Sequence, residues 1–126
     1  MHMAKKDPTP NGLTRGHEPS VLILTSLASG PKHGYALQKD IEAFAGVMLG
    51  PGTLYGAITR LDERGLIAPT GGSERRQPYR ITAAGRAALV GTLREMRNVA
   101  DVGATRLGIA ALTARLRSVA PRGRFA

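Results

Sequence analysis

The apolar residues of this chain recur at helical spacing in three successive stretches, which predicts three helices. The first stretch runs from Pro19 to Ser29 and stops at a Gly-Pro pair. The second stretch ends at Gly46, and four of its residues are expected to share one buried face: Tyr35, Leu37, Ile41 and Phe44. The third stretch starts at Pro51, a proline tolerated in a first turn, and ends at Gly65; its inward residues are Leu54, Ala57, Ile58 and Leu61.

Two short β-like runs follow the third helical stretch. They are Leu66–Ala68 and Tyr79–Thr82, and the polar, Gly-rich segment 70–78 between them is predicted to be a turn. Two helices followed by a two-stranded ribbon form the winged helix-turn-helix arrangement. We therefore expect a mainly α fold with a small β-hairpin: a winged helix-turn-helix plus a long C-terminal dimerisation helix.

The C-terminal helix is predicted over residues 83–119, with Thr82 as its N-cap. Small and apolar residues recur there in alternating steps of four and three, a heptad-like seam: Leu89, Leu93, Met96, Ala100, Gly103 and Leu107. Such a seam requires a partner helix, so we predict a homodimer. Because internal glycines weaken a helix, a bend would fall at Gly103 or Gly108.

These patterns divide the chain into four parts. Residues 1–18 hold prolines and glycines among polar and basic residues, which predicts a flexible basic N-terminal arm. Residues 19–82 are expected to form the winged helix-turn-helix DNA-binding domain, and residues 83–119 the dimerisation helix. Residues 120–126 are predicted to be a basic tail.

The charge of the chain points to a polyanionic partner. Among 126 residues, 18 Lys and Arg stand against 9 Asp and Glu, a formal net charge of +9. A nucleic acid and an anionic membrane would both satisfy this charge. No apolar run approaches the roughly 20 residues that a membrane helix needs, and the first residues do not resemble a signal peptide. We therefore expect a soluble cytoplasmic protein without a membrane partner.

Catalytic and metal-binding residues are sparse. The chain has no Cys and three scattered His, which excludes thiolate chemistry and argues against a metal site. Its carboxylates form no paired set, and its serines have no placed His partner. The sequence predicts neither an enzyme nor a cofactor.

The residues expected to bind DNA cluster on the third helix and around it. With the apolar face turned inward, the outward side chains are Thr53, Tyr55, Thr59 and Arg60. Hydroxyl groups would bond phosphate, and Arg60 would read a guanine edge. Arg75 and Arg76 at the turn suit phosphate or minor-groove contact, although a solvated turn is the plainer interpretation. The remaining candidates are Lys32, His33, Tyr35 and Tyr79.

Several segments resemble the PadR family of transcriptional regulators, in order and at compatible spacing between Pro19 and Arg97. The segments are His33-Gly34-Tyr35, Gly50-Pro51-Gly52-Thr53-Leu54-Tyr55, Leu61-Asp62-Glu63-Arg64-Gly65-Leu66-Ile67 and Tyr79-Arg80-Ile81-Thr82-Ala83-Ala84-Gly85-Arg86. Two positions depart from the family pattern: Gly50 replaces a common Ser, and Gly56 replaces a larger residue. The single C-terminal helix indicates the shorter branch of the family.

The resemblance implies a homodimer that represses promoters and releases its double-stranded operator DNA when a small effector binds. It also implies that Tyr35, Thr53 and Tyr55 face DNA or support its binding. The effector would be small and apolar or aromatic. With 4% aromatic residues and no Trp, an aromatic sandwich is not supported, so aliphatic groups and Met96 or Met48 would line the pocket.

Three classes of function stay open at this point. The first is a sequence-specific dimeric repressor, which the motifs and the seam favour. The second is a non-specific architectural nucleic-acid binder, which the charge alone supports. The third is a protein-interaction domain that uses the same wing.

Overall fold

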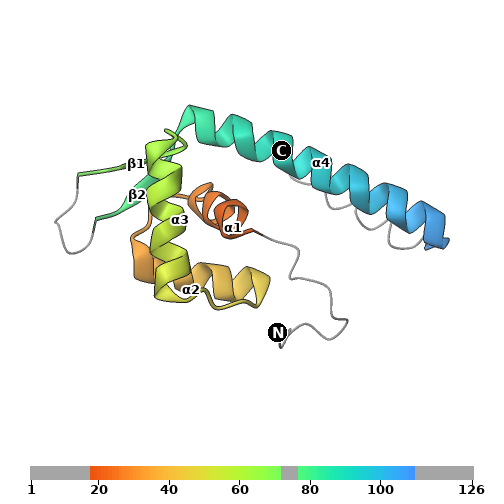
Figure 1. The fold of residues 1–126 in the computed structure, drawn as a ribbon, viewed down its shortest axis with the longest axis horizontal. Coiled ribbons are helices and arrows are strands. Elements are labelled where there is room, and N and C mark those ends of the chain that lie inside the picture. The colour runs from red at the N-terminus through yellow and green to blue at the C-terminus, as the bar shows by residue number, and fades with distance from the viewer. Residues whose placement is uncertain (1–17, 72–76, 110–126) are drawn as a thin grey trace, which may run out of the picture. The chain divides into compact units, whose positions relative to one another are not determined.

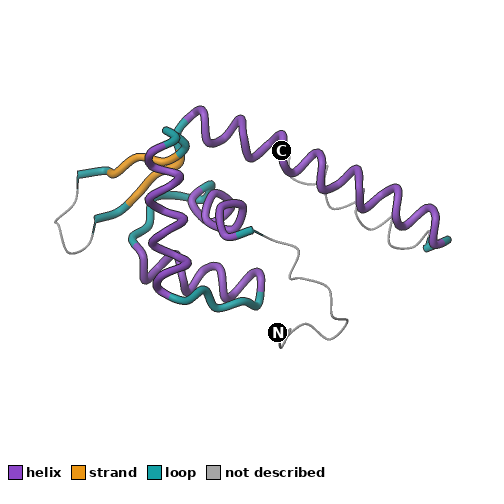
Figure 2. The backbone as a smooth tube through the Cα atoms, in the orientation of Figure 1, coloured by secondary structure: helices purple, strands orange, loops and turns teal. Residues whose placement is uncertain are grey.

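The computed structural model describes residues 18–71 and 77–109 and divides the chain into two compact units, residues 1–89 and 90–126. Figure 1 labels its elements, and Figure 2 colours the helices purple and the strands orange. The elements are α1 (Pro19–Leu27), α2 (Gly34–Ala45), α3 (Pro51–Glu63), β1 (Ile67–Pro69), β2 (Tyr79–Ile81) and α4 (Ala83–Leu107). This order confirms the predicted winged helix-turn-helix with a long C-terminal helix. The predicted arm, up to residue 17, and the predicted tail lie outside the described residues.

The core of the first unit is formed by the inward faces of α1, α2 and α3, closed by the hairpin. α1 is short and strongly apolar, and three of its consecutive residues are buried, which suits a helix covered by two others. α3 buries all four of the residues predicted to face inward. The largest fully buried apolar side chains of this core are Ile23, Leu27, Leu37, Ile41, Leu54, Leu61 and Ile67.

Glycines end α2 and follow α3 as the sequence predicts. Gly46, the C-cap of α2, has φ 71°, and Gly65, which follows the last turn of α3, has φ 76°. Both lie in the left-handed region, where a side chain would be strained. The predicted stop signals of the second and third helices are therefore confirmed.

The predicted buried face of α2 is wrong at two of its four positions. Leu37 and Ile41 are fully buried, but Tyr35 is 65% exposed and Phe44 is 47% exposed. Tyr35 lies two positions from Leu37, which is more than half a helical turn away, so the two cannot share a face. Phe44 lies in the last turn of α2 and is only half covered.

The hairpin pairs β1 with β2 in antiparallel register, Ile67 opposite Ile81 and Pro69 opposite Tyr79. Ile67 and Ile81 point into the core, while Arg80 is exposed on the outer face. Lys32, in the α1–α2 connection, adds a bridge to Tyr79 through two backbone hydrogen bonds of 3.1 and 2.9 Å. The wing is thus attached to the start of α2 as well as to the end of α3.

The first turns of α4 belong to the core of the first unit. Thr82 is the N-cap: its hydroxyl oxygen accepts the Gly85 amide at 3.0 Å and donates to the Gly65 carbonyl at 2.7 Å. Gly85 packs so closely against the hairpin that a Cβ there would lie 2.9 Å from Ile81 Cγ1. Leu89 is buried in the same core, so it is not part of an exposed seam as the sequence predicted.

The described part of the second unit is the remainder of α4 and the two residues that follow. α4 continues through Gly103 without a break and ends at Leu107. Gly108 has φ 76°, a left-handed conformation that stops the helix, so of the two predicted bend positions Gly108 is the one used. Residues 110–119 of the predicted helix lie outside the described residues.

Candidate nucleic-acid interface

α3 presents a polar face opposite its buried one. Thr53, Tyr55, Thr59 and Arg60 are all exposed on it. They lie within about two turns of one helix, so they form a continuous surface along it. The structure therefore brings together the four α3 residues that the sequence singles out.

Tyr55 connects α3 to the start of α2. Its ring and hydroxyl lie against Gly34, the first residue of α2, and a Cβ built on Gly34 would lie 2.8 Å from Tyr55 Cζ. Only a glycine allows this approach. The first turns of α2 and α3 are therefore held side by side, which places the N-terminal amides of both helices close to one surface.

The N-terminus of α3 is open for an anion. Gly50 is the N-cap and offers no side-chain cap, and Pro51, Gly52 and Thr53 are all exposed. The amides of Gly52 and Thr53 precede the first intrahelical bond of α3, which Leu54 donates to the Gly50 carbonyl. Exposed amides at the positive end of a helix dipole attract phosphate.

The Thr59 hydroxyl donates its proton to a backbone carbonyl of the same helix. Its Oγ1 donates to the Tyr55 carbonyl four residues earlier, at 3.0 Å. A phosphate oxygen can only accept a hydrogen bond, so Thr59 would have to break this bond to contact phosphate through its hydroxyl. The predicted hydroxyl-to-phosphate role of Thr59 is therefore not the one that its geometry favours.

Arg60 lies along the helix surface above Gly56. Its Nη1 atom is 3.6 Å from the position that a Cβ of Gly56 would occupy. The side chain is exposed and carries a planar guanidinium, the group best suited to a guanine edge.

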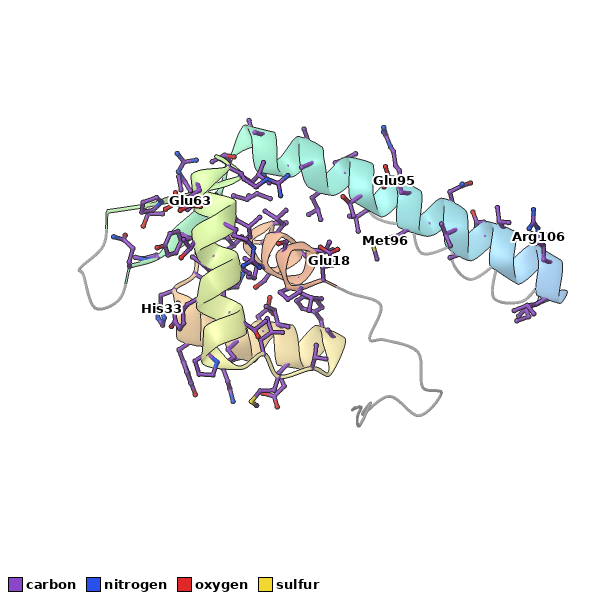
Figure 3. All side chains as sticks on the ribbon, viewed as in Figure 1. Glu18, His33, Glu63, Glu95, Met96 and Arg106 are labelled. Atoms are coloured by element: carbon purple, nitrogen blue, oxygen red, sulfur yellow. The ribbon has the colours of Figure 1, made fainter. Side chains whose placement is uncertain are left out.

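The start of α2 adds two of the predicted residues to this surface. Figure 3 shows His33 at the edge of the domain, beside α3. His33 occupies the N-cap position of α2 without a side-chain cap bond, and Tyr35 is exposed in the first turn. The Nζ atom of Lys39 lies 6.0 Å from the centroid of the Tyr35 ring, a cation–π contact. Lys39 was not among the predicted residues, although its position one turn after Tyr35 is the signal that would have found it.

The Lys32 side chain is turned into the domain. Its ammonium donates to the Ser26 carbonyl at 2.5 Å and to Ser29 Oγ at 2.8 Å. It lies 4.0 Å from Asp40, which accepts a 2.6 Å hydrogen bond from the buried Ser26 hydroxyl. The Lys32 side chain is only 17% exposed. Its geometry fits a polar cluster that joins α1 to α2 better than the predicted DNA contact.

The wing holds the remaining predicted residues. Tyr79 is half-buried and packs against the core, so its ring is mainly structural. Arg75 and Arg76 lie outside the described residues. Arg80, which precedes a buried isoleucine on β2, is exposed and was missing from the predicted set. Its alternation with inward neighbours on a strand is the signal that would have identified it.

Beyond Leu89, α4 exposes more apolar surface than the predicted seam contains. Leu93 and Leu107 are exposed at 43% and 74%, while Met96, Ala100 and Gly103 are half-buried. Sequence reasoning missed three further exposed residues: Val90, Val99 and Val102. Each falls one position from a residue of the four-and-three pattern, so a strict heptad excludes them.

Among residues 18–71 and 77–109, no three His, Cys, Asp or Glu side chains gather as a metal site would require. None of the helices described in those two ranges is long and apolar enough to cross a membrane.

Comparison with known proteins gives this surface a context. Residues 23–90, more than half of the chain, match the model of a family described as the transcriptional regulator PadR-like family. Over 72 residues the chain is 44% identical to an uncharacterized 37.1 kDa protein in transposon TN4556 of Streptomyces fradiae. That match covers 57% of this chain but only 21% of the Streptomyces protein, so the chain spans about a fifth of that relative.

Solved structures show the same fold. A PadR family transcription regulator from Clostridium difficile has a TM-score of 0.65 at 25% identity, over 72% of this chain and 99% of that chain. A PadR family transcriptional regulator from Eggerthella lenta has a TM-score of 0.64 at 28% identity, over 75% and 86% of the two chains. A transcriptional regulator from Clostridium thermocellum has a TM-score of 0.61 at 30% identity, over 66% and 86%.

Proposed function

Because the chain belongs to the PadR-like family of transcriptional regulators, we propose that it is a dimeric repressor that binds a specific DNA operator and leaves it when a small effector binds. The family consists of regulators and not of enzymes. The observation that carries the proposal is the exposed polar face of α3, joined to the start of α2 by the contact between Tyr55 and Gly34.

The chemistry of this face suits the major groove. The open N-terminus of α3 and the Tyr55 hydroxyl would hold phosphates, which fixes the position of the helix on the duplex. Arg60 would then read a guanine through its N7 and O6 acceptors. His33 and Tyr35 would contact the neighbouring backbone, and Arg75, Arg76 and Arg80 would follow it along the wing. Because its proposed operator lies on DNA inside the cell, the protein is proposed to be cytoplasmic.

The dimer is proposed to form along the exposed part of α4. Leu93, Val99 and Leu107 would lose apolar surface to a second copy, which is the main favourable term in association.

The proposed release from DNA requires a pocket for the effector. The described part of the second unit has a small open pocket of about 210 Å³ lined by Asp101, Val102, Thr105 and Arg106. Its volume is below the usual range for ligand sites, roughly 300–1,000 Å³, although most of its lining surface is apolar. The effector pocket proposed for a small apolar or aromatic molecule would therefore be completed by the second copy.

Selection of binding sites from randomised duplex DNA tests the proposal. A dimeric specific regulator selects an inverted repeat with half-sites roughly 10–10.5 base pairs apart, or a multiple of that. Recovery of such a repeat supports the proposal. Recovery of unrelated sequences would favour a non-specific architectural binder, for which the net charge of +9 is the supporting observation.

A further inference from the structure

The polar face of α3 has a gap at Gly56, a half-buried residue that contributes no side chain. The residue lies in the middle of the helix, on the side opposite Leu54, Ala57 and Ile58, with Thr59 and Arg60 as its neighbours one turn later. A Cβ at this position would meet one described atom within 4 Å, Arg60 Nη1 at 3.6 Å, which is ordinary van der Waals contact.

The free domain gains nothing from a glycine at this position. Gly56 has no positive φ, and an alanine would fit without moving a neighbour. Alanine would also stabilise the helix, because glycine has the lower helix propensity. The property that glycine alone supplies here is the missing side chain, which matters only to a partner that approaches this face closely.

Thr59 borders the gap with its methyl group. Its hydroxyl is turned to the Tyr55 carbonyl at 3.0 Å, so the γ-methyl is the part of this exposed side chain left for a partner. In the major groove of DNA the projecting apolar group is the C5-methyl of thymine, and a threonine methyl is one of the groups that contacts it.

We infer that Gly56 and Thr59 form a recognition spot for one thymine in each half-site, a specificity determinant within the operator-binding role proposed above, on which it rests. The gap at Gly56 admits the thymine methyl, and the Thr59 methyl packs beside it. Arg60 reads the neighbouring base pair. The half-site therefore contains a thymine recognised by shape and apolar contact, with no hydrogen bond from α3 to its edge.

Substitution of uracil for thymine tests this directly, because uracil keeps the base pair and removes only the methyl group. Each thymine of the selected duplex is replaced in turn, and affinity is measured by fluorescence anisotropy. We expect one position per half-site at which uracil weakens binding by about three- to fivefold, the size of one buried methyl group. Thr59→Ser, which keeps the hydroxyl and removes the methyl, should show a smaller difference in affinity between the thymine and uracil duplexes than the wild type does.

A second variant tests the gap itself. Gly56→Ala should raise the thermal midpoint and weaken binding to the thymine duplex by about tenfold, because its methyl would occupy the space of the thymine methyl. Gly91→Ala is the matched control. Gly91 likewise lies inside a helix and has no positive φ. It is exposed with no described atom within 4 Å of its Cβ position, so this change should raise the midpoint and leave DNA binding unaltered.

The outcomes separate this inference from the proposed function. An inverted repeat with no uracil-sensitive thymine, or with equal sensitivity in the wild type and Thr59→Ser, overturns the thymine spot and leaves the operator-binding role standing. Wild-type affinity in Gly56→Ala overturns it as well. If no sequence is selected at all, the proposed function fails, and the inference fails with it.

Discussion

The Tyr55 ring of α3 lies on the Cα of Gly34, the residue that begins α2. This contact brings the N-terminal turns of two helices to one surface, although the two residues are far apart in the sequence. It also explains why the His-Gly-Tyr segment has a glycine at its centre. The candidate interface thus depends on the close contact between Tyr55 and Gly34 as well as on exposed side chains.

Replacing Gly34 with alanine should destabilise the domain by about 1–3 kcal/mol, the usual cost of overpacking, measured by urea unfolding. The same replacement in a Tyr55→Ala background should cost much less, because the clashing ring is gone. A double-mutant cycle compares the two values. Equal costs with and without Tyr55 would contradict the contact.

Thr82→Ala should lower the free energy of unfolding by about 1–2 kcal/mol, because it removes the N-cap of α4 and a bond to the Gly65 carbonyl. Thr82→Ser keeps both hydrogen bonds and is the matched control. Urea unfolding measures both variants. If serine and alanine destabilise the protein equally, the hydroxyl is not the group that matters.

Lys32→Met should reduce stability while leaving the salt dependence of DNA binding unchanged. The ammonium of Lys32 bonds to Ser26 and Ser29 within the domain, so no phosphate contact is lost with it. Removal of a true phosphate contact lowers the slope of log affinity against log salt by about 0.9. Arg80→Met, at an exposed position proposed to follow the backbone, is the comparison variant and should lower the slope. A reduced slope in Lys32→Met would place this residue on DNA after all.

Changing both Leu93 and Leu107 to aspartate should dissociate the dimer without unfolding the winged domain, because both side chains are exposed in α4. Leu89→Ala should instead lower stability by about 2–5 kcal/mol, as for any large-to-small change in a core. Sedimentation equilibrium gives the oligomeric state, and circular dichroism gives the fold. A double aspartate variant that still sediments as a dimer would show that the two copies meet elsewhere.

The helices and their ends were predictable because each carries a local signal. Gly46 and Gly65 adopt the left-handed turns expected of them, and Thr82 caps the helix that follows it. The α3 residues were predictable for the same reason: once Leu54 and Leu61 face inward, helical geometry fixes which positions face out.

The errors at Lys32 and Leu89 arose where tertiary contacts decide. Nothing in the sequence tells whether Lys32 extends into solvent or turns back to carbonyls at the end of α1, since those acceptors gather only in the folded domain. Leu89 continues the apolar pattern of α4 without interruption, yet it is buried in the core of the first unit. Periodicity identifies an apolar stripe but does not say which partner covers each part of it.

The most direct test of the central claim is a fluorescence-anisotropy titration at several salt concentrations. It compares DNA taken from immediately upstream of the gene for this protein with a shuffled sequence of the same composition. A specific regulator that represses its own gene should prefer the upstream DNA by about tenfold or more, well within the usual ratio of specific to non-specific affinity. Equal affinity for both duplexes, with a steep loss of binding as salt rises, would contradict that account and leave only generic attraction to DNA.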